Sequence, residues 1–152
     1  MEIAQIVIPL DIPIAKKPVH RILVVDDNEA CAMTMMWTME GLGHISQMAF
    51  DGKTAIKKAK LFKPDVVLLD IGLPDMNGYE ICQAMRREPE LCNTIFIAQT
   101  GWAQKEHRIR SKEAGFDHHL VKPVDITALK KILSELDSSG FKDITQPLEI
   151  AL

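Results

Sequence analysis

The chain has 152 residues, which is within the usual size of one domain and is enough to bury an apolar core. Apolar residues make up 47% and charged residues 26%, as in ordinary globular proteins. The net charge of −3, without a cluster of Lys and Arg, argues against direct nucleic-acid binding, and no apolar stretch is long enough for membrane insertion.

Short apolar runs alternate with helical patterns between residues 20 and 137. The runs are rich in Val, Ile and Leu without polar alternation, which predicts buried parallel strands at 21–26, 45–49, 66–70, 94–99 and 118–121. Helices are predicted between and after them at 28–42, 52–62, 77–87, 104–114 and 125–136. This alternation predicts an α/β fold, a doubly wound five-stranded parallel sheet with helices on both faces.

Capping and helix-breaking residues stand at the ends of the predicted helices. The candidate N-caps are Asp27 or Asn28, Asp51, Asn77 and Asp125. The candidate stops are Gly43, Pro64, Pro89 and Gly115. Within the first helix, the spacing of Cys31, Met35, Met39 and Leu42 predicts the face that packs on the sheet.

The two flanks have a different composition from the centre. Residues 1–19 are predicted to be an N-terminal extension or linker, and residues 138–152 a C-terminal tail. Each flank is either poorly ordered or pairs with a partner or with the domain itself. The domain proper is predicted to span 20–137.

Side chains suited to phosphoryl chemistry follow four of the predicted strands. These are Asp26 and Asp27, Asp70, Thr100 and Lys122. Ligands of an open parallel sheet bind outside the carboxyl ends of its strands, so these groups are expected to converge in one crevice. Three carboxylates, a hydroxyl and an ammonium suit a divalent metal ion and a phosphoryl group.

Each of these residues has a chemical role and a plainer alternative. Asp70 precedes a glycine-rich turn and is a competent nucleophile toward phosphorus. Asp26 and Asp27 supply oxygen ligands for Mg²⁺, or else Asp27 caps the first helix and Asp26 is a solvated acid. Thr100 and Lys122 can hold phosphoryl oxygens, or else they are a turn residue and a surface charge.

The segments VVDDN, LLDIGLPDMNGYE, TGW and HLVKP together resemble the receiver domain of two-component response regulators, over about residues 20–137. The stretch GFDHHLVKPVD, together with the LLDIGLP loop, is most similar to the receivers of hybrid sensor histidine kinases. The resemblance implies a flavodoxin-like sheet of order 2-1-3-4-5.

The resemblance also implies a site. Mg²⁺ would be bound by Asp27, Asp70 and the backbone carbonyl of Gly72, with Asp26 acting through water. Asp70 would take a phosphoryl group from a phosphohistidine on a sensor histidine kinase or a histidine phosphotransfer protein. Thr100 and Lys122 would then hold the phosphate oxygens.

One position departs from the pattern of many receivers, and three others suggest a docking surface. His119 stands three positions before the lysine on the last strand, where many receivers have an aromatic residue that turns inward when the threonine moves. The histidine ring either replaces that aromatic ring sterically, or its protonation near neutral pH biases the output surface of the domain. Met33 and Trp37, four residues apart on the first helix, and Trp102 are candidates for a partner patch, with ordinary partial burial as the alternative for the first two.

The sequence therefore predicts a signalling phosphoacceptor that is not a turnover enzyme. Aspartyl-phosphate phosphatases need a second aspartate two positions after the nucleophile, where this chain has Gly72. A receiver-like interaction scaffold without phosphorylation is the remaining alternative. No DNA-binding segment follows residue 137, and three cysteines without metal-type spacing predict reduced, packed thiols in a cytoplasmic protein rather than a zinc site.

Overall fold

Strands and helices alternate along the residues that the structure, a computed structural model, describes: 19–101 and 105–136. In chain order the elements are β1 (Arg21–Val25), α2 (Glu29–Gly41), β2 (Ile45–Ala49), α3 (Gly52–Phe62), β3 (Val66–Asp70), α4 (Gly78–Arg86), the short 3₁₀ helix η1 (Pro89–Leu91), β4 (Ile95–Thr100), α5 (Lys105–Ala114) and β5 (His118–Val121). A last helix covers residues 126–136. Every predicted strand and helix is present, with its ends within one residue of the prediction.

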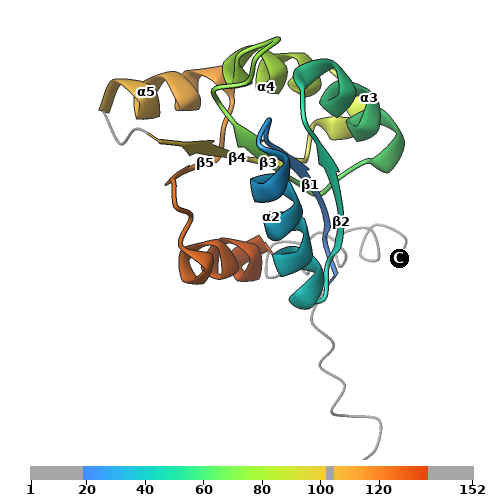
Figure 1. Cartoon of the computed structure of the whole chain (residues 1–152). Coiled ribbons are helices and arrows are strands. Elements are labelled where there is room, and N and C mark those ends of the chain that lie inside the picture. Colours follow the sequence, from blue (N-terminus) through green and yellow to red (C-terminus); the bar gives the residue numbers. More distant parts are fainter. Residues whose placement is uncertain (1–18, 102–104, 137–152) are drawn as a thin grey trace, which may run out of the picture. The chain divides into compact units, whose positions relative to one another are not determined.

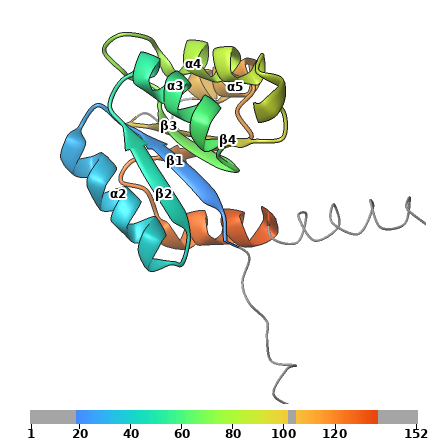
Figure 2. The same ribbon diagram turned by 90° about the vertical axis from the view of Figure 1, so that its right-hand side faces the viewer.

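The five strands form one parallel sheet in the order β2-β1-β3-β4-β5. The predicted doubly wound, flavodoxin-like order is thereby confirmed. Within the unit Val19–Ile132, α2 and residues 126–132 of the last helix lie on one face of the sheet, and α3, α4 and α5 lie on the other (Figures 1 and 2). Among the described residues, no helix has the length and apolar character that crossing a bilayer would require.

The sheet is buried on both faces, which explains its uninterrupted apolar runs. Alternate strand residues, such as Leu23, Val67 and Phe96, belong to the larger core under α3, α4 and α5. On the opposite face, Met39 of α2 and Leu129 of the last helix are fully buried. The central strand β3 is buried along its whole length, so the site residue at its end sits on a rigid support.

The helices begin where the sequence places polar caps. The side chains of Asn28, Asp51 and Asn77 accept hydrogen bonds from the backbone N–H groups three residues further on, at 3.1, 2.7 and 2.9 Å. Asn28 rather than Asp27 is therefore the cap of α2. The Asp125 carboxylate accepts a hydrogen bond from the N–H of Thr127 at 2.9 Å at the start of the last helix.

The predicted face of α2 is confirmed only in part, since Met39 is fully buried and Met35 and Leu42 are half-buried. Cys31 is exposed, and the buried residues of this helix are Ala32 and Met39. The helix is apolar nearly all round, so its periodicity does not single out one face. Cys92 is also exposed, so of the three cysteines only Cys82 is packed as expected. The predicted character of the flanks lies outside the described residues, apart from residue 19.

Candidate functional site

The predicted site residues lie at one end of the sheet, where four neighbouring parallel strands stop. Asp26 and Asp27 follow β1, Asp70 is the last residue of β3, and Thr100 is the last residue of β4. Lys122 directly follows β5, and its backbone N–H donates to the Thr100 carbonyl at 2.7 Å. The expectation that these residues share one edge of the sheet is met by the strand order.

The ammonium of Lys122 lies between two of the carboxylates. Its Nζ is 2.9 Å from Oδ2 of Asp26 and 2.8 Å from Oδ2 of Asp70. The side chain of Asp26 is only 4% exposed and that of Asp70 13%, whereas Lys122 is 30% exposed. Partial burial by itself would lower the pKa of Lys122, but the hydrogen bonds and negative charges of Asp70 and Asp26 raise it overall. The lysine is therefore charged at neutral pH and holds the two strand ends together.

Asp26, Asp27 and Asp70 form an acidic cluster. Each offers one carboxylate oxygen, and these oxygens lie within 4.8 Å of one another. Around Mg²⁺, with ligands at roughly 2.1 Å, adjacent oxygens are about 3 Å apart and opposite oxygens about 4 Å. The three carboxylates and the Lys122 ammonium leave two net negative charges, which a divalent cation neutralises. The cluster therefore fits Mg²⁺, because it offers three oxygen ligands and, together with Lys122, its net negative charge equals in size the charge of the ion.

Hydrogen bonds hold the loop after β3 in place at three positions. The Gly72 N–H donates to Oδ1 of Asp70 at 3.0 Å, which orients the carboxylate. The Gly78 N–H donates to the Ile71 carbonyl at 2.8 Å. The Asp75 carboxylate accepts from the N–H groups of Gly52 and Lys53, at 2.8 and 3.2 Å.

Asp75 is a positioning residue that the sequence did not single out. Its bond from Gly52 lowers the pKa of its carboxyl, and the partial positive charge at the start of α3 favours the carboxylate. A polar residue in the turn after Pro74 was a visible signal of loop structure, but its partner is 23 residues away in the sequence.

His119 is half-buried on β5, opposite Ala98 of β4. Its Nδ1 lies 3.1 Å from the Ser111 hydroxyl on α5. This contact joins β5 to the helix that covers it. Thr100 is buried at the end of the neighbouring strand, with 4% exposure. The histidine thus occupies the predicted place next to the strand that carries the threonine.

The candidate partner patch is described only in part. On α2, Trp37 is 58% exposed and Met33 is half-buried, so this helix presents an apolar group to solvent. Trp102 lies outside the described residues.

Residues 22–134 match the response regulator receiver domain family. The chain is 31% identical over 106 residues to the DNA-binding dual master transcriptional regulator RpaA of Synechocystis, covering 70% of this chain and 44% of RpaA. It is 32% identical over 103 residues to the alkaline phosphatase synthesis transcriptional regulatory protein PhoP of Bacillus subtilis, covering 68% of this chain and 42% of PhoP. This chain thus spans less than half the length of these relatives.

Solved structures give the same picture. The chemotaxis response regulator CheY4 of Vibrio cholerae superposes with a TM-score of 0.72 at 28% identity, covering 78% of this chain and 98% of CheY4. A CheY-like response regulator receiver domain protein of Methanospirillum hungatei gives a TM-score of 0.75 at 28% identity, covering 83% and 99%. The receiver domain of a signal transduction histidine kinase from Syntrophus aciditrophicus gives 0.72 at 26% identity, covering 80% and 92%.

Proposed function

This chain belongs to the response regulator receiver domain family of two-component systems, and we propose that Asp70 is its phosphoacceptor. Receiver domains take phosphoryl groups from histidine kinases and are signalling modules rather than turnover enzymes. The donor for Asp70 is then a phosphohistidine of a sensor histidine kinase or a histidine phosphotransfer protein. The receiver domain spans residues 20–137, with extensions at 1–19 and 138–152.

The Lys122 ammonium, shared between Asp26 and Asp70 beside Asp27, is the observation that carries this proposal. A carboxylate that accepts a phosphoryl group gains an anionic neighbour, which a nearby fixed cation stabilises. Lys122 is already within hydrogen-bond distance of Asp70, so it needs only a small movement to contact a new phosphoryl oxygen.

The transfer step conserves atoms and charge. One carboxylate oxygen of Asp70 attacks phosphorus, and the new O–P bond forms as the P–N bond to the donor histidine breaks. The histidine nitrogen keeps the electron pair of that bond and takes a proton from solvent. Lys122 and the Thr100 hydroxyl then hold oxygens of the acyl phosphate.

Asp26, Asp27, Asp70 and the Gly72 carbonyl are the residues that would hold Mg²⁺, with Asp26 acting through water. When bound, the ion neutralises the incoming phosphoryl oxygens, which otherwise repel the three carboxylates. The geometry of Asp26 agrees with an indirect role, because its Oδ1 accepts from the Asn28 N–H at 2.9 Å and its Oδ2 from Lys122.

Incubation with Mg²⁺ and acetyl phosphate, followed by intact mass measurement, tests the acceptor. We expect one phosphoryl adduct on the wild-type chain and none on Asp70→Asn. Glu90→Gln is the matched control, because it also removes one carboxylate but from an exposed position on η1. The adduct should form in that control and should not form on the wild-type chain when EDTA is present from the start of the incubation.

The same experiment decides between this function and an interaction scaffold. A wild-type chain that takes no phosphoryl group and shows no beryllium fluoride-dependent change would favour the scaffold. The role of His119 in reporting phosphorylation stays a prediction, and it is tested by comparing the phosphorylation-induced change at pH 6 and pH 8. Identical changes at both values would remove a protonation effect.

We also place the docking surface of the phosphodonor on α2, around Met33 and the exposed Trp37. An apolar indole at the surface favours a protein contact when a partner covers it. Trp37→Ala should slow transfer from the kinase and leave phosphorylation by acetyl phosphate unchanged. Equal slowing with both donors would mean that Trp37 acts on the site and not on docking.

A further inference from the structure

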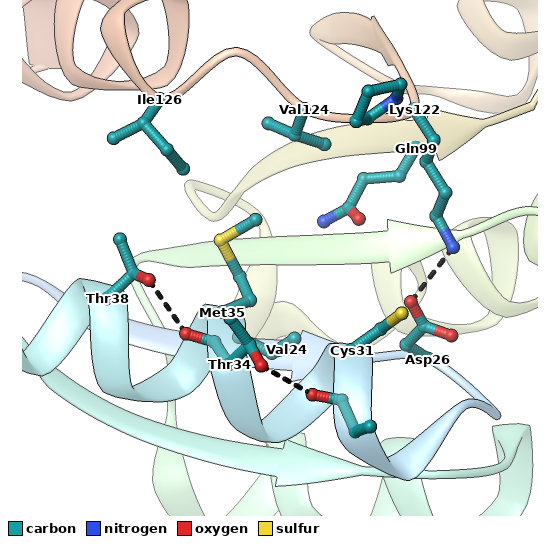
Figure 3. A pocket seen from close by; sticks show the side chains of 12 residues that line it. Val24, Asp26, Cys31, Thr34, Met35, Thr38, Gln99, Lys122, Val124 and Ile126 are labelled. Atoms are coloured by element: carbon teal, nitrogen blue, oxygen red, sulfur yellow. Dashed lines mark hydrogen bonds and ion pairs between the residues drawn. The ribbon is translucent and has the colours of Figure 1, made fainter.

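A cavity of about 680 Å³ opens beside the acidic cluster, between α2 and the segment that follows β5. Small-molecule sites have volumes of roughly 300–1,000 Å³. Apolar groups form much of its wall, among them Val24, Met35, Val124 and Ile126. Figure 3 shows these side chains around the cavity, with Asp26 and Lys122 at one end. Nothing in the phosphorylation chemistry requires such a space.

The cavity has a polar group that the fold leaves unsatisfied. Gln99 of β4 is 3% exposed, and its Nε2 is buried without a hydrogen-bond partner among the described residues. In Figure 3 its amide points toward the cavity, in the direction of Met35. A buried amide N–H₂ without an acceptor is unfavourable, so an acceptor that enters the cavity gains a hydrogen bond at little cost in solvation. The position thus favours a carbonyl oxygen.

The wall formed by α2 offers hydrogen-bond acceptors, in contrast to the donor of Gln99. The Thr34 hydroxyl donates to the Ala30 carbonyl at 2.8 Å, and the Thr38 hydroxyl donates to the Thr34 carbonyl at 2.7 Å. Their protons are used, so these two hydroxyl oxygens offer only lone pairs to a ligand. An N–H donor suits this wall, whereas a second acceptor does not.

The charges at the end of the cavity disfavour an ion. The Asp26 carboxylate repels an anion, and the Lys122 ammonium repels a cation. Because these two groups already pair with each other, neither needs a charged partner from the ligand. The ligand that fits is therefore uncharged.

We propose that this cavity binds an uncharged small molecule in which a secondary amide joins apolar groups. Its carbonyl accepts from Nε2 of Gln99, its N–H donates to a threonine hydroxyl of α2, and its apolar groups cover Val124 and Ile126. The cavity shares Asp26 and Lys122 with the proposed phosphoacceptor site, but binding of the amide does not require phosphorylation.

Cys31 makes the proposal testable without knowing the natural ligand. Its thiol is exposed and lines the cavity, whereas Cys92 is exposed elsewhere and Cys82 is buried. In reversible disulfide exchange, the cysteine thiolate attacks the probe disulfide and releases one probe thiolate. The probe is the disulfide of N-mercaptoethyl benzamide, which carries a phenyl ring and a secondary amide. Its isostere, phenylbutanethiol disulfide, has two methylene groups in place of the amide.

The measured quantity is the ratio of probe on Cys31 to probe on Cys92 at equilibrium, obtained by peptide mass mapping. Oxidised mercaptoethanol, which is too small to reach the cavity wall, calibrates the intrinsic difference between the two thiols. We expect the benzamide ratio to exceed the mercaptoethanol ratio by about tenfold, and the isostere to fall between them. Cys82 should stay unmodified throughout, which shows that the chain is folded.

Two variants assign the effect to the cavity. Gln99→Met keeps the volume but removes the donor to the ligand carbonyl, so the excess of the benzamide ratio over the isostere ratio should shrink. Val124→Trp fills the space, so both should fall to the mercaptoethanol ratio. Equal ratios for benzamide and mercaptoethanol in the wild type would overturn the site. Equal ratios for benzamide and isostere in the wild type would overturn the amide assignment.

Discussion

Replacing Gly78 with alanine should force open the loop that positions Asp70. Gly78 is the first residue of α4, and a Cβ built there would lie 2.6 Å from the Ile71 Cα and 2.9 Å from the Asp70 carbonyl oxygen. Both neighbours are backbone atoms that no side-chain rotation can move away. The alanine is therefore accommodated only by displacing the residues that directly follow β3.

The size of the effect follows from these distances. Ordinary contact begins at 3.4 Å, so the backbone at Ile71 must move by about 0.8 Å relative to the 2.6 Å contact. Overpacking of this kind lowers the free energy of unfolding by about 1–3 kcal/mol. Because the neighbour of Gly78 is backbone and cannot rotate away, we expect a loss of about 3 kcal/mol for Gly78→Ala. For a domain of this size the melting temperature should fall by roughly 10 °C. Displacement next to Asp70 should also slow phosphorylation roughly ten- to a hundred-fold.

Gly41→Ala is the matched control. Gly41 is the last residue of α2, and a Cβ there would meet nothing within 4 Å. Alanine favours helix over glycine, so this variant should be unchanged or stabilised by about 0.5–1 kcal/mol. Thermal and urea unfolding, with the acetyl phosphate assay on the same samples, measure both variants. Equal melting temperatures for Gly78→Ala and Gly41→Ala, with wild-type phosphorylation, would refute the argument.

Three further outcomes are expected. Lys122→Met leaves two buried carboxylates without their cation, so without metal it should lose about 1–3 kcal/mol of stability, and Mg²⁺ should raise its melting temperature more than that of the wild type. Asp75→Asn should be less stable than the wild type above about pH 4 and converge with it in more acidic solution, because the lowered pKa of Asp75 adds stability only where the unfolded chain would be ionised. Burial raises the pKa of Cys82 from 9.0 to about 12, so stability should fall as the pH rises from 9 to 12, and less steeply in Cys82→Ala.

Each of these three predictions has a clear contrary result. An equal Mg²⁺ effect on Lys122→Met and the wild type would separate the lysine from the acidic cluster. Parallel acid unfolding curves would mean that Asp75 does not stabilise the loop through its charge. Rapid reaction of Cys82 with a thiol reagent at pH 8, as fast as that of exposed Cys92, would contradict its burial.

The fold was predictable because local and long-range signals agree along most of the chain. The β3 run Val66–Leu69 is buried on both faces, so its composition alone indicates a central parallel strand. Gly43 and Gly115 end helices with φ of +98° and +108°, a conformation that glycine adopts without strain. Lys63 has φ of 51° without being glycine, and the following Pro64 explains why α3 cannot continue.

The site was predictable to the extent that it depends on strand ends. Asp26, Asp70 and Lys122 meet because parallel strands deliver their last residues to one edge, whatever the intervening sequence. The contacts of Asp75 and the environment of Gln99 depend on tertiary packing, and no short pattern encodes them. Gln99 stands in an apolar strand, where a single polar residue is indistinguishable from the end of a run.

The ion pair of Asp26 and Lys122 borders both the acidic cluster and the apolar cavity. Any coupling between two binding sites that share these residues is reciprocal. Whatever factor Mg²⁺ imposes on the affinity of the cavity for an amide, the amide imposes on the affinity of the cluster for Mg²⁺. Titrating either ligand at fixed concentrations of the other therefore measures the same coupling free energy.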